Sequence, residues 1–208
     1  MTDVNLPVIL FAAFLAASSP GPATLAIAGT SMSSGRREGL AIALGVTTGS
    51  LIWSISAAFG LGAVMQAHAW IFEIVRYLGG AYLMFLAFKA ARSAWRGHQM
   101  APSSLAAITP RRAYAKGVAL HLTNPKAILF FGALYAIGIP PGTPPSELIK
   151  VILAVGLQSV IMFHLYALIF SSAPMAQAYA RAKRWFESFF AIAFGAIAIK
   201  VLTTSVER

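Results

Sequence analysis

Two short proline-containing segments carry the most distinctive polar groups of the chain, and each interrupts a long apolar stretch. They are Ser19-Pro20-Gly21-Pro22 and Asn124-Pro125-Lys126. Proline inside a helix removes a backbone donor and clashes with the preceding turn, at a cost of about 3 kcal/mol. We therefore predict that each segment breaks a helix and that a second half-helix begins directly after it. Ser19 and Asn124 are residue types that cap such helix starts.

A half-helix that begins inside an apolar bundle can bind an anion. Its first amides have no partner within the helix, and the helix dipole places partial positive charge there. The two breaks therefore predict a site for an anionic group such as a carboxylate. A simple proline kink at each position is the alternative.

Lys126 adds a full positive charge to the second break. It follows Arg112 by 14 residues, which corresponds to about 21 Å along a helix. In a membrane span a charge at that depth is costly and indicates a functional residue. Lys126 could bind a substrate carboxylate or donate hydrogen bonds to the carbonyl groups that the break leaves without a partner. The alternative is a side chain that lies nearer the interface and snorkels to water.

Other polar residues within the apolar stretches are weaker indications of function. Glu73 and Arg76 lie three residues apart and form either a helical ion pair or an outer gate. His121 and His164 could relay protons, since histidine titrates near neutral pH, or could simply be packed. Gln158 is a further polar residue at depth and a candidate for substrate binding. None of the 6 acidic residues lies clearly at the middle of an apolar stretch.

Glycines follow one face of the second apolar stretch. Gly45 and Gly49 are four residues apart and continue a line of small residues that begins at Ala41. Such a line lets two helices approach closely in a membrane. The partner helix could belong to the same chain or to a second copy in a homodimer.

The composition indicates that these apolar stretches are surrounded by lipid. Of the 208 residues, 58% are hydrophobic and 11% are charged, whereas soluble domains carry about 25% charged residues. We therefore predict an all-α integral membrane protein with a single domain over residues 1–208. The net charge of +10, gathered in short loops, favours contact with anionic lipid over nucleic acid.

Several cofactor classes are disfavoured by the residues present. The chain has no cysteine, which excludes disulfides, iron–sulfur clusters and thiolate metal sites. It has no glycine-rich phosphate loop that would bind ATP. We expect neither a cofactor nor a structural metal.

Six apolar stretches predict six transmembrane helices. They cover about residues 6–30, 39–65, 70–90, 114–139, 148–172 and 186–204. Two Lys or Arg residues lie between the first and second stretches, six around the link between the third and fourth, and three between the fifth and sixth, whereas loops 66–69 and 139–147 have none. The positive-inside rule then places both termini outside.

Five spans would divide these cationic clusters between the two sides of the membrane, so six fit the charges better. Six spans also predict two inverted three-helix repeats, over about residues 1–97 and 111–208, with the first and fourth helices broken. Transporters built in this way place their site near the membrane midplane.

Four motifs occur in order along the chain. They are Ser19-Pro20-Gly21-Pro22, Gly45 with Gly49, Gly79-Gly80-Ala81-Tyr82-Leu83, and Thr123-Asn124-Pro125-Lys126-Ala127. Together they resemble motifs of the threonine/homoserine/lysine exporter family of bacterial amino-acid exporters, and the resemblance covers nearly the whole chain. Segments 124–135 and 179–186 are most similar to the threonine-exporting branch.

The resemblance implies a secondary exporter of small neutral or hydroxylated amino acids in the bacterial inner membrane. It places Gly45, Gly49 and Tyr82 among the substrate-binding residues. One departure is Ser50, which stands where many members carry an acidic residue, and this argues against carboxylate-based proton coupling and against a cationic substrate. The alternatives are export of another small solute, such as a divalent metal, and an intramembrane enzyme.

Overall fold

The computed structural model describes residues 4–61, 69–96, 108–140 and 142–203, and within these ranges the chain is helical without strands. The elements in chain order are α1 (Leu6–Ser18), α2 (Pro22–Ser34), α3 (Arg36–Ile55), the π-helix η1 (Ser56–Leu61), α5 (Ala69–Arg96), α6 (Pro110–Leu122), α7 (Pro125–Gly138), α8 (Pro145–Phe170) and α9 (Ala173–Thr203). The all-α prediction is confirmed.

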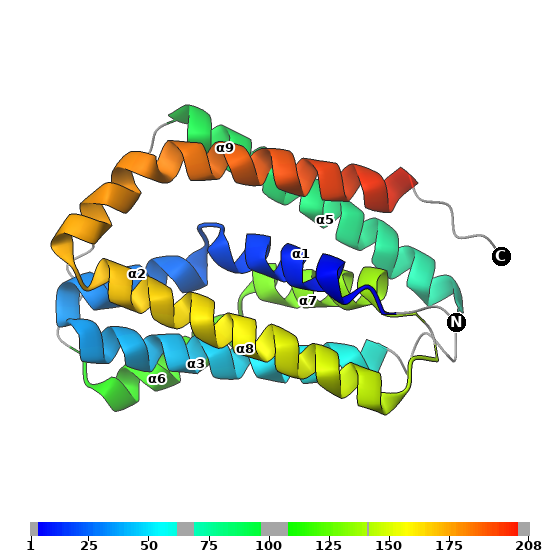
Figure 1. Cartoon of the computed structure of the whole chain (residues 1–208), viewed down its shortest axis with the longest axis horizontal. Helices are drawn as coiled ribbons and strands as arrows, with labels where there is room; N and C mark the ends of the chain where they lie inside the picture. Colours follow the sequence, from blue (N-terminus) through cyan, green and yellow to red (C-terminus); the bar gives the residue numbers. More distant parts are fainter. Residues whose placement is uncertain (1–3, 62–68, 97–107, 141, 204–208) are drawn as a thin grey trace.

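The helices run along the long axis of an elongated bundle (Figure 1). The α2–α3 and α8–α9 junctions lie at one end of this axis, and the start of α1 and the end of α9 lie at the other end. α5 and α9 pack side by side along one side of the bundle, while α3, α6 and α8 lie on the opposite side. The broken helix formed by α1 and α2 runs between these two groups, together with α7.

Two described helices are long and apolar enough to cross a membrane alone, namely the segment Arg36–Gly60 and α8. The pair α1 and α2 also qualifies when it is taken as one span bent by 50°. α6 is shorter and basic, since it contains Arg111, Arg112 and Lys116. The two long apolar helices and the bent pair are consistent with the predicted helical membrane protein.

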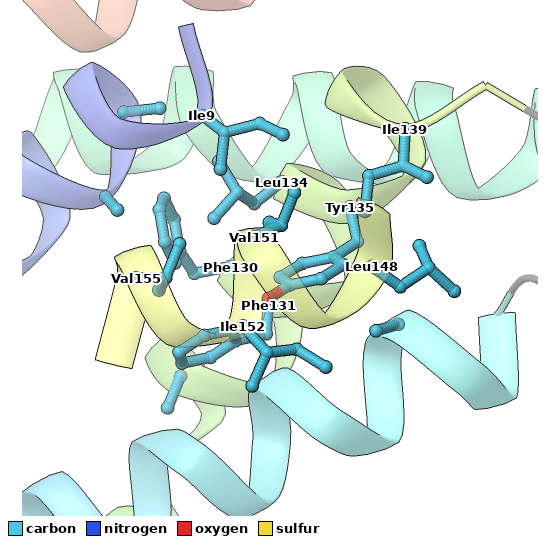
Figure 2. Close-up of a cluster of buried hydrophobic side chains, with 14 residues drawn as sticks. Ile9, Phe130, Phe131, Leu134, Tyr135, Ile139, Leu148, Val151, Ile152 and Val155 are labelled. Atoms are coloured by element: carbon cyan, nitrogen blue, oxygen red, sulfur yellow. The ribbon is translucent and has the colours of Figure 1, made fainter. Parts of the chain in front are cut away.

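Three clusters of buried apolar side chains hold the bundle together. The largest joins α1, α7 and α8, and Figure 2 shows the ring of Tyr135 among side chains that include Phe131, Leu148 and Val151. A second cluster joins α2, α3, α6 and α8. A third lies between α5 and α9 and includes Leu15 of α1. Close packing of this kind associates helices in lipid, where little hydrophobic driving force exists.

The line of small residues on α3 faces α6 of the same chain. A Cβ atom added to Gly45 would lie 2.1 Å from the carbonyl oxygen of Tyr114, and one added to Gly117 would lie 2.4 Å from that of Ile42. Backbone atoms therefore touch across the α3–α6 contact. The glycine pattern is satisfied within one chain and gives no support to a homodimer.

Candidate functional site

The first break separates α1 from α2. α1 ends at Ser18, and α2 begins at Pro22 after extended backbone at Gly21, which has φ −163°. The Gly21 amide donates to the Thr24 hydroxyl over 2.8 Å, and that hydroxyl donates back to the Gly21 carbonyl over 3.1 Å. Gly21 and Thr24 therefore form the start of α2. Ser19 does not cap α2 as we expected, because it ends α1 and donates its hydroxyl to the Ala16 carbonyl.

The second break separates α6 from α7. α6 ends at Leu122, and α7 begins at Pro125. Asn124 caps the new helix, since its side-chain oxygen accepts a hydrogen bond of 3.0 Å from the amide of Lys126. The main-chain oxygen of Asn124 also accepts from the amide of Ala127 over 2.9 Å. The cap predicted at Asn124 is present.

Lys126 joins the two breaks. Its Nζ donates to the carbonyl oxygens of Ala16 and Ser19, each over 3.1 Å, and also to the Ser19 hydroxyl. These bonds engage all three N–H groups of the ammonium, so the half-buried charge is fully hydrogen-bonded. In this conformation Lys126 ties the start of α7 to the end of α1. It lies beside Gly21, where an added Cβ would be 3.2 Å from Nζ.

Two further side chains bond to carbonyls of α1. The Tyr166 hydroxyl of α8 donates to the Ser18 carbonyl over 2.5 Å, and the Gln158 amide donates to the Leu10 carbonyl over 3.0 Å. Sequence reasoning singled out Gln158 but missed Tyr166. The available signal was a phenol within the apolar run of α8, because a buried tyrosine hydroxyl usually needs a partner.

A cavity lies at the junction of the two breaks. Its empty volume is about 510 Å³, including the part open to solvent. The predicted site residues that line it are Ser19, Gly21, Asn124, Lys126 and His121. Much of the remaining wall consists of alanine and phenylalanine side chains from α1, α7 and α8. The cavity thus combines a few polar groups and one ammonium with an apolar wall, a composition typical of small-molecule sites.

His121 is held rigidly in the cavity wall. The side chain is 5% exposed, and Nε2 lies 3.0 Å from the Ser50 hydroxyl, whereas Nδ1 has no hydrogen-bond partner. Gly49 packs against this residue, since an added Cβ would lie 2.8 Å from Cβ of His121. Ser50 therefore supports His121 at the position where the exporter family often carries an acid.

The other predicted site residues do not line this cavity. Tyr82 is partly buried and packs between the first and third apolar clusters. His164 is half-buried, and its Nδ1 lies 2.8 Å from a carbonyl of its own helix. The helix breaks are formed at Pro20, Pro22 and Pro125. On α3, Gly45 and Gly49 pack against α6. Gln158 donates a hydrogen bond to α1. The side chains of Glu73 and Arg76 lie outside the described part of the structure.

Comparison with known proteins identifies the family. The model of the LysE type translocator family matches residues 14–205. Threonine efflux proteins of Salmonella typhi and Escherichia coli K12 are 27% and 25% identical over 190 residues, which are 90% of this chain and 92% of each relative. An uncharacterized membrane protein of Pseudomonas aeruginosa is 33% identical over 169 residues, 79% of this chain and 78% of the relative.

No solved structure matches the chain. The family match covers nearly all of the sequence and includes both helix breaks, as the resemblance in the four motifs implied. The family is one of translocators and the relatives are efflux proteins, so the chain is a transporter and not an enzyme. The chain belongs to the LysE type translocator family.

Proposed function

We propose that this transporter exports small neutral or hydroxylated amino acids, such as threonine, from the cytoplasm by secondary transport. The observation that carries the proposal is the cavity at the junction of the two helix breaks, with the Lys126 ammonium in its wall. The names of the threonine efflux relatives support amino acids as the substrate class and efflux as the direction.

The proposed topology has six spans in the bacterial inner membrane, with both termini outside. The start of α1 and the end of α9 lie at one end of the bundle, whereas the α2–α3 and α8–α9 junctions lie at the other (Figure 1). The latter end contains the basic residues that the positive-inside rule assigns to the cytoplasm. We further propose that residues 1–97 and 111–208 form inverted repeats, because each begins with a helix broken by proline.

The substrate carboxylate would lie near the starts of α2 and α7, where helix dipoles place partial positive charge. Lys126 would bind the carboxylate directly. The ammonium group would be received by main-chain carbonyls near the end of α1. None of the described residues that line the cavity is acidic, which favours an amino acid with an uncharged side chain.

Substrate binding must compete with the bonds that Lys126 makes in this conformation. All three of its N–H groups are engaged by Ala16 and Ser19 of α1. A carboxylate that takes over one or two of these donors weakens the tie between α1 and α7. Binding would thereby favour a rearrangement of the two broken helices, as alternating access requires. We propose that proton influx supplies the energy.

Transport by the purified protein tests this proposal. In proteoliposomes loaded with unlabelled threonine, we expect uptake of labelled threonine by counterflow, and competition by small neutral amino acids. Lys126→Ala should reduce counterflow about 10–100-fold, since a hydrogen bond to a charged group contributes about 1.5–3 kcal/mol. Lys150→Ala is the matched control, because Lys150 is exposed and pairs with Glu147 three residues away.

Two results would contradict the proposal. Wild-type protein that catalyses no counterflow of any amino acid would exclude the substrate class. Full counterflow by a folded Lys126→Ala variant would remove Lys126 from the site. In cells, deletion of the gene in a threonine-overproducing host should lower extracellular threonine, and overexpression should raise it.

A further inference from the structure

Ser159 of α8 contributes a hydroxyl group to the cavity wall. Its side chain is 7% exposed, and it lines the cavity together with Val155 and Phe163, which lie four residues on either side of it. No hydrogen bond joins its hydroxyl to another of the described residues. Serine within a helix can donate to the carbonyl four residues earlier, as Ser31 and Ser188 do here. The hydroxyl of Ser159 is instead available to a molecule in the cavity.

A second polar atom without a partner belongs to the same part of the wall. The ring of His121 makes an edge contact with that of Phe163, one turn after Ser159, with 6.0 Å between the ring centres. Ser50 binds Nε2 of His121, and among the described residues Nδ1 has no hydrogen-bond partner. A polar atom that stays unpaired inside a protein is costly. Ser159 and His121 together therefore indicate that a polar group of the substrate binds at this wall.

The packing of α8 against α1 gives the distance from this wall to Lys126. Gln158 and Tyr166 are eight residues apart, and so are the carbonyls of α1 to which they donate, so the two helices run parallel in register (Figure 1). Ser159 is thus level with Phe11 of α1. The Lys126 ammonium bonds to carbonyls five and eight residues further along α1. At a rise of 1.5 Å per residue, these levels are about 8–12 Å apart.

A small amino acid fits this distance. A hydrogen bond of about 2.8 Å at each end leaves about 2–6 Å for the molecule itself, which corresponds to a few covalent bonds. An amino acid whose carboxylate lies at Lys126 therefore brings its side chain to Ser159 and His121. A side-chain hydroxyl both donates and accepts, so it can pair with a serine hydroxyl and with an imidazole nitrogen.

We infer that Ser159 and His121 are the specificity-determining residues that bind the side-chain hydroxyl of the substrate, and this inference rests on the proposed amino-acid export. Valine has the shape of threonine with a methyl group in place of the hydroxyl. Bound valine leaves the polar atoms of both residues unpaired, whereas threonine pairs with them. The site therefore selects threonine over valine.

Competition in the counterflow assay measures this selection. In proteoliposomes with a trace of labelled threonine, wild type should need about 10–100-fold more valine than unlabelled threonine for half inhibition. Ser159→Ala should reduce this ratio about tenfold, because the variant binds threonine less tightly and valine no less tightly. His121→Gln should also reduce the ratio, since glutamine can still reach Ser50 but has no polar group at the position of Nδ1.

Controls separate this role from a structural one. Ser146→Ala makes the same change at an exposed position of α8 and should leave the ratio unchanged. Structural damage would weaken the binding of both amino acids equally and leave the ratio at its wild-type value. That result for Ser159→Ala or His121→Gln overturns the inference, as does a wild type with normal threonine counterflow that does not prefer threonine to valine. Absence of wild-type counterflow would instead contradict the proposed function.

Discussion

The substitution of glycine by alanine should change stability in opposite directions at Gly45, which lies in the contact between α3 and α6, and at Gly132, which does not. Gly45→Ala would place a Cβ atom 2.1 Å from the Tyr114 carbonyl oxygen and 2.9 Å from the Val118 amide nitrogen. Both atoms are backbone, so relief requires the helices to separate by about 1.4 Å, since ordinary contact lies near 3.5 Å. Gly132→Ala on α7 adds the same methyl group where, among the described residues, no heavy atom beyond the adjoining backbone of its own helix lies within 4 Å.

The magnitudes follow from two opposing terms. Overpacking costs about 1–3 kcal/mol, and contact with rigid backbone favours the upper limit. Replacement of glycine by alanine in a helix gains about 1 kcal/mol in propensity. Gly45→Ala should therefore destabilise the protein by about 2 kcal/mol, and Gly132→Ala should stabilise it by about 1 kcal/mol. For a chain of this length, 1 kcal/mol corresponds to about 2–4 °C in the melting temperature.

Thermal unfolding of the purified variants in one detergent measures the difference. We expect the melting temperature of Gly45→Ala to be lower than that of wild type by about 4–8 °C and that of Gly132→Ala to be higher by about 2–4 °C. Equal melting temperatures for the two variants would refute the reasoning, because they share the chemical change and differ only in the atoms that the methyl group meets. The close approach of α3 and α6 would then be wrong.

Two further substitutions test buried hydrogen bonds. Tyr135→Phe removes the hydrogen bond between the Tyr135 and Ser54 hydroxyls and should lower the stability by about 1 kcal/mol. A double-mutant cycle with Ser54→Ala measures this interaction, and additive effects of the two substitutions would show that the hydroxyls do not interact. Ser50→Ala leaves buried His121 without its hydrogen-bond partner at Nε2 and should cost about 1–3 kcal/mol in thermal unfolding, whereas an unchanged melting temperature would contradict the role of Ser50 as its support.

Local chemistry made the helix breaks predictable. Proline cannot continue a helix without loss of a hydrogen bond, so Pro20, Pro22 and Pro125 located the breaks within one or two residues. Asn124 was predictable as a cap because its short side chain reaches the amide two residues later. Ser19 looked equivalent in sequence, but the extra Pro-Gly pair moved the start of α2 beyond its reach.

Long-range partners were less accessible to sequence reasoning. The bonds of Lys126 to Ala16 and Ser19 span more than 100 residues, and the sequence left open whether Lys126 bound a substrate or closed carbonyls. The partners of Tyr166 and Glu187 depend on how α8 and α9 pack against α1 and α5. Periodicity does not determine that packing, because α5, α8 and α9 carry apolar side chains on both their buried and their exposed faces.

Lysine has side-chain properties that suit both the structure and the proposed transport at the junction of the breaks. A lysine ammonium is a compact charge with three donors on a flexible stem, whereas arginine presents a rigid planar fork. Three donors match the three acceptors that Ala16 and Ser19 provide, and the flexible stem allows them to be released without movement of α7. Because the freed carbonyls of α1 and a substrate carboxylate would compete for the same ammonium, the group that closes the empty break is also suited to detecting the substrate. These hydrogen bonds are compatible with both roles that the sequence left open for Lys126, namely binding of a substrate and hydrogen bonding to the freed carbonyls.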